Sequence, residues 1–227
     1  MILLAIDTSA NLCAACIYDA DADIVRGRSV LDIGKGHAEH LMGTIAKVLE
    51  EAGLSYPAIG RIVVSIGPGS FTGVRVGVSA ARGLALALKI PAIGVSTLEA
   101  LAAEARIAFP DRAVAAVIDG RRDDLYLAGY DRDGKLIHEP MAVSVETARE
   151  FAAVRNAVLA GNGADMLIAS VPESYFDIAS RAATGDVATY ARLVATLEPP
   201  FDKPKPLYLR GADAKPQAGF TLRRVES

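Results

Sequence analysis

The sequence predicts an α/β fold built from two similar halves. Short apolar runs typical of strands alternate with longer segments of helical periodicity along the whole chain. The run 62–66 is apolar except for Ser65, as expected for a strand in a sheet that is covered on both faces. Each half opens with strand, turn and strand and later reaches a helix, which indicates a duplicated fold although the internal sequence match is weak.

The first half is expected to begin with a β-hairpin, 1–7 and 12–18, followed by a third strand over 24–30. Leu41 and Ile45 begin an apolar stripe that predicts a helix. The same kind of pattern gives, in order, a helix over 37–52, a strand over 62–66, a helix over 71–88, a strand over 92–95, and a helix to about 106 that a capping box of Ser96 and Glu99 opens.

The second half repeats this order after residue 109. Its predicted elements are strands over 113–118, 125–130 and 135–138, a helix over 145–153, a strand over 157–160 and a helix over 187–197. We therefore expect a first lobe over 1–108, a second lobe over 109–198 and, because the remainder is rich in Pro and Lys, an extended arm over 199–227.

Charge and hydropathy restrict the function classes. The net charge is -3 and the basic residues form no run, so the chain is not expected to grip RNA by itself. The apolar run 2–6 is too short for a signal peptide or a membrane-spanning helix. We therefore expect a cytoplasmic protein with no membrane association.

Cys13 and Cys16 form a Cys-x-x-Cys pair, which raises the alternatives of redox or zinc chemistry. They lie in a predicted strand, where a spacing of three places the side chains on opposite faces. No second Cys or His pair completes a zinc site. A structural role is favoured.

The glycine-rich loop 65–73 joins a buried strand to a helix. Gly67 and Gly69 allow close backbone approach, and the helix start offers free N–H groups to a phosphate or carboxylate. The loop matches neither the dinucleotide-binding pattern nor the Walker pattern. A tight strand-to-helix turn without a ligand is the alternative.

The helix over 71–88 is apolar around most of its circumference, so more than one of its sides should be covered. Gly73, Gly77, Ala81 and Ala85 form a row of small residues at a spacing of four, which suggests close approach of another helix. We expect a subunit interface, with a central core helix as the alternative. The same surface should form a homodimer in the absence of another partner. The residues assigned to this interface, with the neighbouring helix 37–52, are Leu41, Ile45, Gly73, Val74, Gly77, Val78, Ala81, Arg82 and Ala85.

The stretch GPGSFTGVRVGVSAARGLALALKIPAIGVSTLEALA resembles the hallmark of the TsaB family, also called YeaZ. The segments AIDTS, GHAEHL, AVIDGRRDDLY, AGNGAD and PLYLRGADAKPQ match further landmarks of that family in order, so that the resemblance covers nearly the whole chain. It implies a two-lobed fold of the actin, Hsp70 and sugar-kinase (ASKHA) type, with duplicated mixed sheets flanked by helices.

The resemblance also implies a function. The chain would be a non-catalytic subunit that binds and supports the TsaD-type transferase, which transfers threonylcarbamoyl to the anticodon-loop adenosine of ANN-decoding tRNAs. A TsaE-type ATPase and a carbamoyl-AMP synthase would act with this pair. The tRNA would be reached only through the complex, and ATP would act at the level of the complex rather than as a cofactor of this chain.

The metal-binding motif of the sister transferase is not preserved. That family carries Gly-Val-Asn-His-x-x-x-His, whereas here Thr97 and Leu101 stand at the two histidine positions. A hydroxyl is a poor ligand for such an ion and Leu is none. His37 and His40 are expected to share a helix face without a third ligand, and His138 stands alone. No metal site and no catalytic residue are predicted.

The superfamily binds phosphate near the turns that follow the first strand of each half. The resemblance therefore makes Asp7, Thr8, Ser9 and Asp119, with Gly67 and Gly69, candidates for a weak nucleotide site. Hydrogen bonding within the turns is the structural alternative. Two other functions remain open, a metal-independent ATP-binding enzyme of the kinase superfold and a metalloprotease-like protein.

Overall fold

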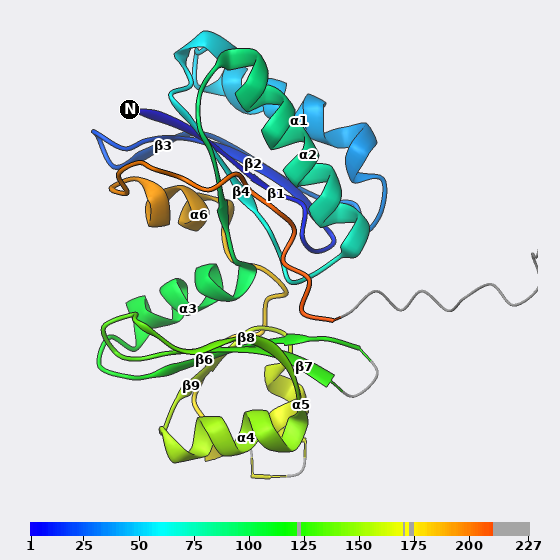
Figure 1. Ribbon diagram of the computed structural model, residues 1–227, viewed down its shortest axis with the longest axis vertical. Coiled ribbons are helices and arrows are strands. Elements are labelled where there is room, and N and C mark those ends of the chain that lie inside the picture. Colours follow the sequence, from blue (N-terminus) through cyan, green and yellow to red (C-terminus); the bar gives the residue numbers. More distant parts are fainter. Residues whose placement is uncertain (122–123, 170, 173–174, 211–227) are drawn as a thin grey trace, which may run out of the picture.

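The computed structural model describes residues 1–121, 124–169, 171–172 and 175–210, and it contains two five-stranded mixed sheets (Figure 1). The elements of the first half are β1 (Ile2–Asp7), β2 (Leu12–Asp19), β3 (Ile24–Asp32), α1 (His37–Glu51), the short 3-10 helix η1 (Tyr56–Ala58), β4 (Arg61–Ser65), α2 (Phe71–Leu88), β5 (Ala92–Val95) and α3 (Thr97–Ala108). Those of the second half are β6 (Val114–Asp119), β7 (Asp124–Tyr130), β8 (Leu136–Ser144), α4 (Val145–Val154), β9 (Val158–Ala160), α5 (Ala164–Ile168), β10 (Ile178–Ser180) and α6 (Val187–Val194).

The two sheets have the same topology, which confirms the predicted duplication. The strand order is β3-β2-β1-β4-β5 in the first and, read in the same sense, β8-β7-β6-β9-β10 in the second. In each sheet the first three strands are antiparallel, and the fourth lies parallel to the first. The ends of β1 and β6 are therefore equivalent positions.

The first sheet is covered on both faces, and alternate residues of β1 divide between the two cores. Leu4 and Ile6 pack in the core under α1 and α2, whereas Leu3 and Ala5 pack in the core under α6. Cys13 and Cys16 divide in the same way, as the strand periodicity predicted. Both thiols are free and buried, and burial raises the pKa of Cys16 to about 12.

The two lobes exchange their last helices, so packing does not follow the predicted boundary at residue 108. Helix α3 packs on the second sheet, while α6 returns to the first (Figure 1). Helices α4 and α5 cover the outer face of the second sheet. One face of each sheet is therefore covered by a helix that comes from the other half of the chain.

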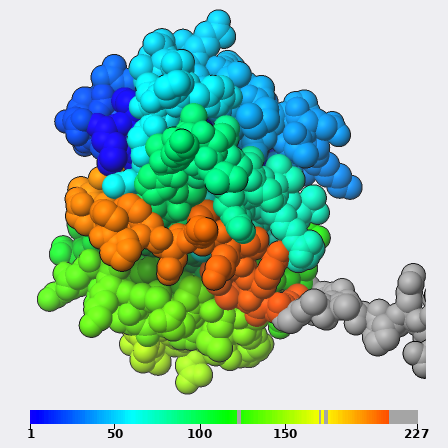
Figure 2. Space-filling view, turned by 45° about the horizontal axis from the view of Figure 1, so that its top comes forward, coloured from blue at the N-terminus to red at the C-terminus, as the bar shows by residue number. Residues whose placement is uncertain are grey.

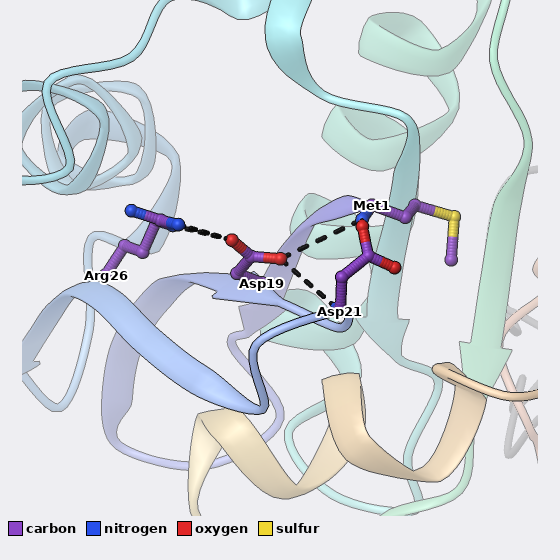
Figure 3. A network of polar contacts seen from close by, with 4 residues as sticks. All are labelled: Met1, Asp19, Asp21 and Arg26. Carbon is purple, nitrogen blue, oxygen red and sulfur yellow. Dashed lines mark hydrogen bonds and ion pairs between the residues drawn. The ribbon is translucent and has the colours of Figure 1, made fainter.

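Polar contacts stabilise the end of the first sheet at which β1 begins and β2 turns into β3 (Figure 3). Asp19 ends β2 and accepts hydrogen bonds from Arg26 Nε and from the backbone N–H of Asp21, at 2.9 and 3.2 Å. The Met1 amino group lies 3.8 Å from Asp19 Oδ1 and also contacts Asp21. These contacts tie the β2–β3 turn to the start of β1.

Residues 199–210 form the described part of the expected arm and contain neither helix nor strand; its remainder, 211–227, lies outside the described residues. The Arg61 guanidinium lies 4.7 Å from the centre of the Phe201 ring, and the Leu207 N–H donates to Ile66 O. Arg210 donates to Gly120 O in the second lobe, at 2.9 Å. The arm therefore runs from the first lobe to the second.

Candidate functional site

Asp7, the first residue expected to face a nucleotide, is 1% exposed at the end of β1. Its Oδ1 accepts hydrogen bonds from the Ser9 N–H, the Ser9 hydroxyl and the Ser65 hydroxyl. Its Oδ2 accepts from the Thr184 hydroxyl at 2.6 Å. The carboxyl group is therefore fully engaged by the chain itself, and this favours the structural alternative for Asp7.

Further hydroxyl groups, on the side of α6, hydrogen-bond to the groups that contact Asp7. Thr184 Oγ1 and Tyr190 Oη lie 2.7 Å apart, and the Thr97 hydroxyl donates to Ser9 Oγ at 3.4 Å. Burial raises the pKa of Tyr190 well above its ordinary value, so the ring remains a neutral phenol. Within the described residues, both oxygens of the Asp7 carboxylate already accept hydrogen bonds from this network.

The glycine loop 65–73 packs against the turn that follows β1. A Cβ at Gly69 would lie 2.1 Å from Ser9 O, and one at Gly73 would lie 2.0 Å from Thr8 O. The Thr8 hydroxyl donates to Gly73 O at 2.7 Å. These glycines are needed because the start of α2 touches the turn after β1, which favours the tight-turn alternative over a phosphate cradle.

An open cleft remains between the two lobes, in front of this closed turn. It has a volume of about 540 Å³, and it brings together Ser9, Gly69 and Asp119 of the predicted nucleotide set but not Asp7, Thr8 or Gly67. Asp119 is exposed; its carboxyl accepts from the Arg121 N–H, and its own N–H donates to Asn162 Oδ1. The start of α2, with Ser70, Phe71 and Thr72, and Arg121 also line the cleft.

The predicted interface set needs a correction, because most of it lies inside the chain. The side chains of Val74 and Val78 are at most 4% exposed, and a Cβ at Gly77 would lie 2.5 Å from Thr8 Oγ1. The small-residue row thus faces the chain's own first lobe. The buried members are Leu41, Ile45, Gly73, Val74, Gly77, Val78 and Ala81, of which Leu41 also lines a groove between α1 and α2; Ala85 is half-buried and Arg82 is exposed.

The outward side of α2 carries a different set of residues, which the sequence analysis missed. Phe71 and Met42 are 56% and 47% exposed beside a groove of about 460 Å³ between α1 and α2. The Arg75 guanidinium lies 3.7 Å from the centre of the Phe71 ring, and Arg75 Nε donates to Tyr208 Oη at 2.7 Å. Helices α1 and α2 pack side by side as expected. The groove between them is lined mostly by apolar residues, with Arg75 as the one cation among its described residues.

Comparison with known proteins places the chain in a family. The family model described as "TsaD: tRNA N6-adenosine threonylcarbamoyltransferase" matches residues 32–159. The tRNA threonylcarbamoyladenosine biosynthesis protein TsaB of Escherichia coli (strain K12) is 35% identical over 133 residues, 59% of this chain and 56% of that protein. The chain thus spans little more than half of that relative's length in the match.

Two further comparisons cover nearly the whole chain. An uncharacterized protein of Mycobacterium tuberculosis (strain ATCC 25618 / H37Rv) is 33% identical over 222 residues, 96% of each chain. The solved structure of YeaZ from Pseudomonas aeruginosa has a TM-score of 0.71 at 28% identity, covering 85% of this chain and 91% of that one. The chain belongs to the TsaB (YeaZ) family.

In this TsaB-family chain, the two residues that stand where the sister family carries metal-binding histidines are buried. Thr97 and Leu101 are both fully buried on α3. Of the two histidines on α1, His37 is buried and His40 is exposed. Within the described residues, no group of three or more His, Cys, Asp or Glu side chains is placed to hold a metal ion.

Helix α2 is, among the described helices, the one that is long and apolar enough to cross a membrane by length and composition. In this TsaB-family fold its inner side contributes Val74, Val78 and Ala81 to the core of the first lobe. Burial of this side accounts for part of its apolar character. The expectation of no membrane association stays a prediction.

Proposed function

We propose that the chain is a non-catalytic partner subunit of the complex that places threonylcarbamoyl on tRNA. The observation that carries this proposal is the closed turn after β1, where Asp7 is 1% exposed and hydrogen-bonded on both oxygens by the chain itself. A phosphoryl-transfer enzyme of this superfold needs that position open to a metal-bound nucleotide. The family relationship supplies the reaction.

The partner is proposed to be the TsaD-type transferase, and its docking surface the groove between α1 and α2. Met42 and Phe71 expose apolar surface there, while the opposite sides of both helices are in the core. Such a contiguous apolar face is typical of protein–protein contacts. We propose that the same face pairs with a second copy when the transferase is absent, and that the TsaE-type ATPase and tRNA join only through the complex, in the cytoplasm.

The alternatives receive less support. An ATP-dependent enzyme would need a reacting group in the cleft, where Asp119 bonds the neighbouring backbone of Arg121. A metalloprotease-like activity is suggested only by the description of one Pseudomonas aeruginosa structure as similar to "peptidase YEAZ", which is 26% identical with a TM-score of 0.73. The buried Thr97 and Leu101 argue against a metal centre.

Depletion followed by rescue tests the proposal. Nucleoside mass spectrometry of cells depleted of the chain should show loss of threonylcarbamoyladenosine, and the wild type should restore it. Met42→Glu places a carboxylate in the groove and should bind the transferase about ten-fold or more weakly, with poor rescue. Asp119→Asn, in the cleft, should rescue fully.

Val154→Glu is the matched control, because Val154 is an apolar helix residue that is 75% exposed on the second lobe. It should bind the transferase and rescue like the wild type. Unchanged nucleoside levels after depletion would overturn the assignment to this pathway. Rescue by Met42→Glu together with failure of Asp119→Asn would show that the chain acts chemically through its cleft.

A further inference from the structure

A separate cavity lies at the far end of α2, between that helix and the arm. It has a volume of about 730 Å³, within the range of small-molecule sites. Figure 2 looks onto this face, where the green end of α2 lies beside the orange arm. It shares no lining residue with the α1–α2 groove.

The walls of this cavity are largely apolar. Leu86 is 82% exposed, which is unusual for a leucine of a helix whose other side is in the core, and Ile90 lines the cavity next to it. Phe201 forms the opposite wall, where stacking against Arg61 fixes the arm. Arg61 is itself held by hydrogen bonds to Val194 O and Leu197 O, so this wall is built before any ligand arrives.

Three cations surround the apolar walls: Arg82, Lys89 and Lys203. No acidic residue lines the cavity, and the described residues offer none of the three an ion-pair partner within 4.0 Å. The chain as a whole carries a net charge of -3, so this local excess of positive charge runs against its average. A rim of this kind favours a negatively charged ligand.

We propose that the cavity binds an amphipathic anion, a small molecule with an apolar body and a single carboxylate, phosphate or sulfonate end. The body lies between Leu86 and Phe201, and the anionic end lies toward Lys89 and Lys203. Binding here is independent of threonylcarbamoyl transfer and of the transferase subunit. It is therefore tested on the purified full chain alone.

A pair of fluorescent probes separates the apolar part of the site from the charged part. Anilinonaphthalene sulfonate carries both, and N-phenylnaphthylamine is its uncharged counterpart. The double variant Lys89→Asn, Lys203→Gln removes two rim charges; Asn is chosen because residue 89 has a φ of 58°, a conformation that Asn tolerates. It should weaken the sulfonate probe about five-fold or more and change the uncharged probe less than about two-fold.

Lys205→Gln is the matched control, because Lys205 is an exposed lysine of the same arm that does not line the cavity. It should bind both probes like the wild type. Leu86→Asp, at an exposed position that folding does not require, should weaken both probes. Met42→Glu reports on the other groove and should change neither.

The proposal is overturned if the wild type binds no sulfonate probe, or if the double variant and Lys205→Gln lose the same affinity. It is also overturned if Met42→Glu, rather than Leu86→Asp, abolishes binding, because the probe then occupies the α1–α2 groove. Circular dichroism of each variant confirms the fold, so a loss of binding is not caused by unfolding.

Discussion

The two lobes place an aspartate at the same point of the same topology and treat it in opposite ways. Asp7 ends β1 and is buried among hydroxyl groups, whereas Asp119 ends β6 and is exposed in the cleft. The first is closed by Ser65 and by Thr184, 58 and 177 positions away along the chain. The two halves share one backbone topology, but the polar side chains around the two aspartates differ.

The helices that follow the fourth strand of each half differ as well. Helix α2, after β4, has 18 residues and one exposed apolar side; its counterpart α5, after β9, has 5. Both starts approach the first strand of their lobe closely, since a Cβ at Gly161 would lie 2.1 Å from Val117 O. The longer helix of the first lobe also carries the exposed apolar residues Phe71 and Leu86.

The largest effect is expected from a charge on the inner side of α2. Val78→Glu places an unpaired carboxylate at a 3% exposed core position, although the sequence analysis assigned Val78 to a subunit interface. It should lower the free energy of unfolding by about 3–5 kcal/mol in urea titrations. Ser79→Glu, on the exposed side, should unfold like the wild type but self-associate less in light scattering.

A stably folded but monomeric Val78→Glu protein would contradict this expectation. It would return the small-residue row to the interface, as the sequence first indicated, and would remove the difference between the two sides of α2.

The next largest effect is the difference in unfolding free energy between substitutions of the two aspartates. Asp7→Asn replaces one acceptor oxygen by a donor among groups that already donate, and should cost about 2–4 kcal/mol of unfolding free energy. Asp119→Asn keeps an acceptor for the Arg121 N–H and should stay within about 0.5 kcal/mol of the wild type. Equal losses in urea titrations would mean that both turns are structural to the same degree.

The smallest effect concerns the contact between the exchanged helices. Glu104 of α3 accepts from the Asp186 N–H and from the Thr189 hydroxyl at the start of α6, and burial raises its pKa above 4.5. The folded state therefore favours the protonated form, and this contribution is present below the unfolded pKa and lost as pH rises through the folded one. Glu104→Gln keeps an acceptor and removes the titration.

The stability advantage of wild type over Glu104→Gln should accordingly fall as pH rises from about 4 to 7, by less than about 1 kcal/mol because the side chain is partly open to solvent. Thermal unfolding at a series of pH values measures it. Parallel stability profiles for the two proteins would show that Glu104 does not titrate in that window.

Periodicity predicted most of the fold because strands and helices were long enough to show it. The placement of Cys13 and Cys16 on opposite faces of the sheet follows from a period of two, and the shared topology of the two sheets agrees with the predicted duplication. The short elements α5 and β10, of 5 and 3 residues, were missed because so few positions carry no recognisable period.

The site was harder to predict for two physical reasons. Helix α2 is apolar on nearly every side, so hydropathy cannot tell its core side from its exposed side, and Val78 and Leu86 look alike in the sequence. The closure of Asp7 depends on hydroxyl groups such as Thr184, whose partners lie far away along the chain. No local pattern marks such a contact, whereas the metal-site substitutions Thr97 and Leu101 could be recognised by comparison with the sister family.

The exchange of α3 and α6 has a consequence for how the protein is made. The first sheet is complete once β5 ends at Val95, but α6, which covers its inner face, begins only at Val187. At a synthesis rate of roughly 5–20 residues per second, that apolar face waits on the order of ten seconds on the ribosome for its cover. The first lobe thus completes its core only after the whole second sheet has emerged, and until then Leu3 and Ala5 lie on a face that chaperones can bind.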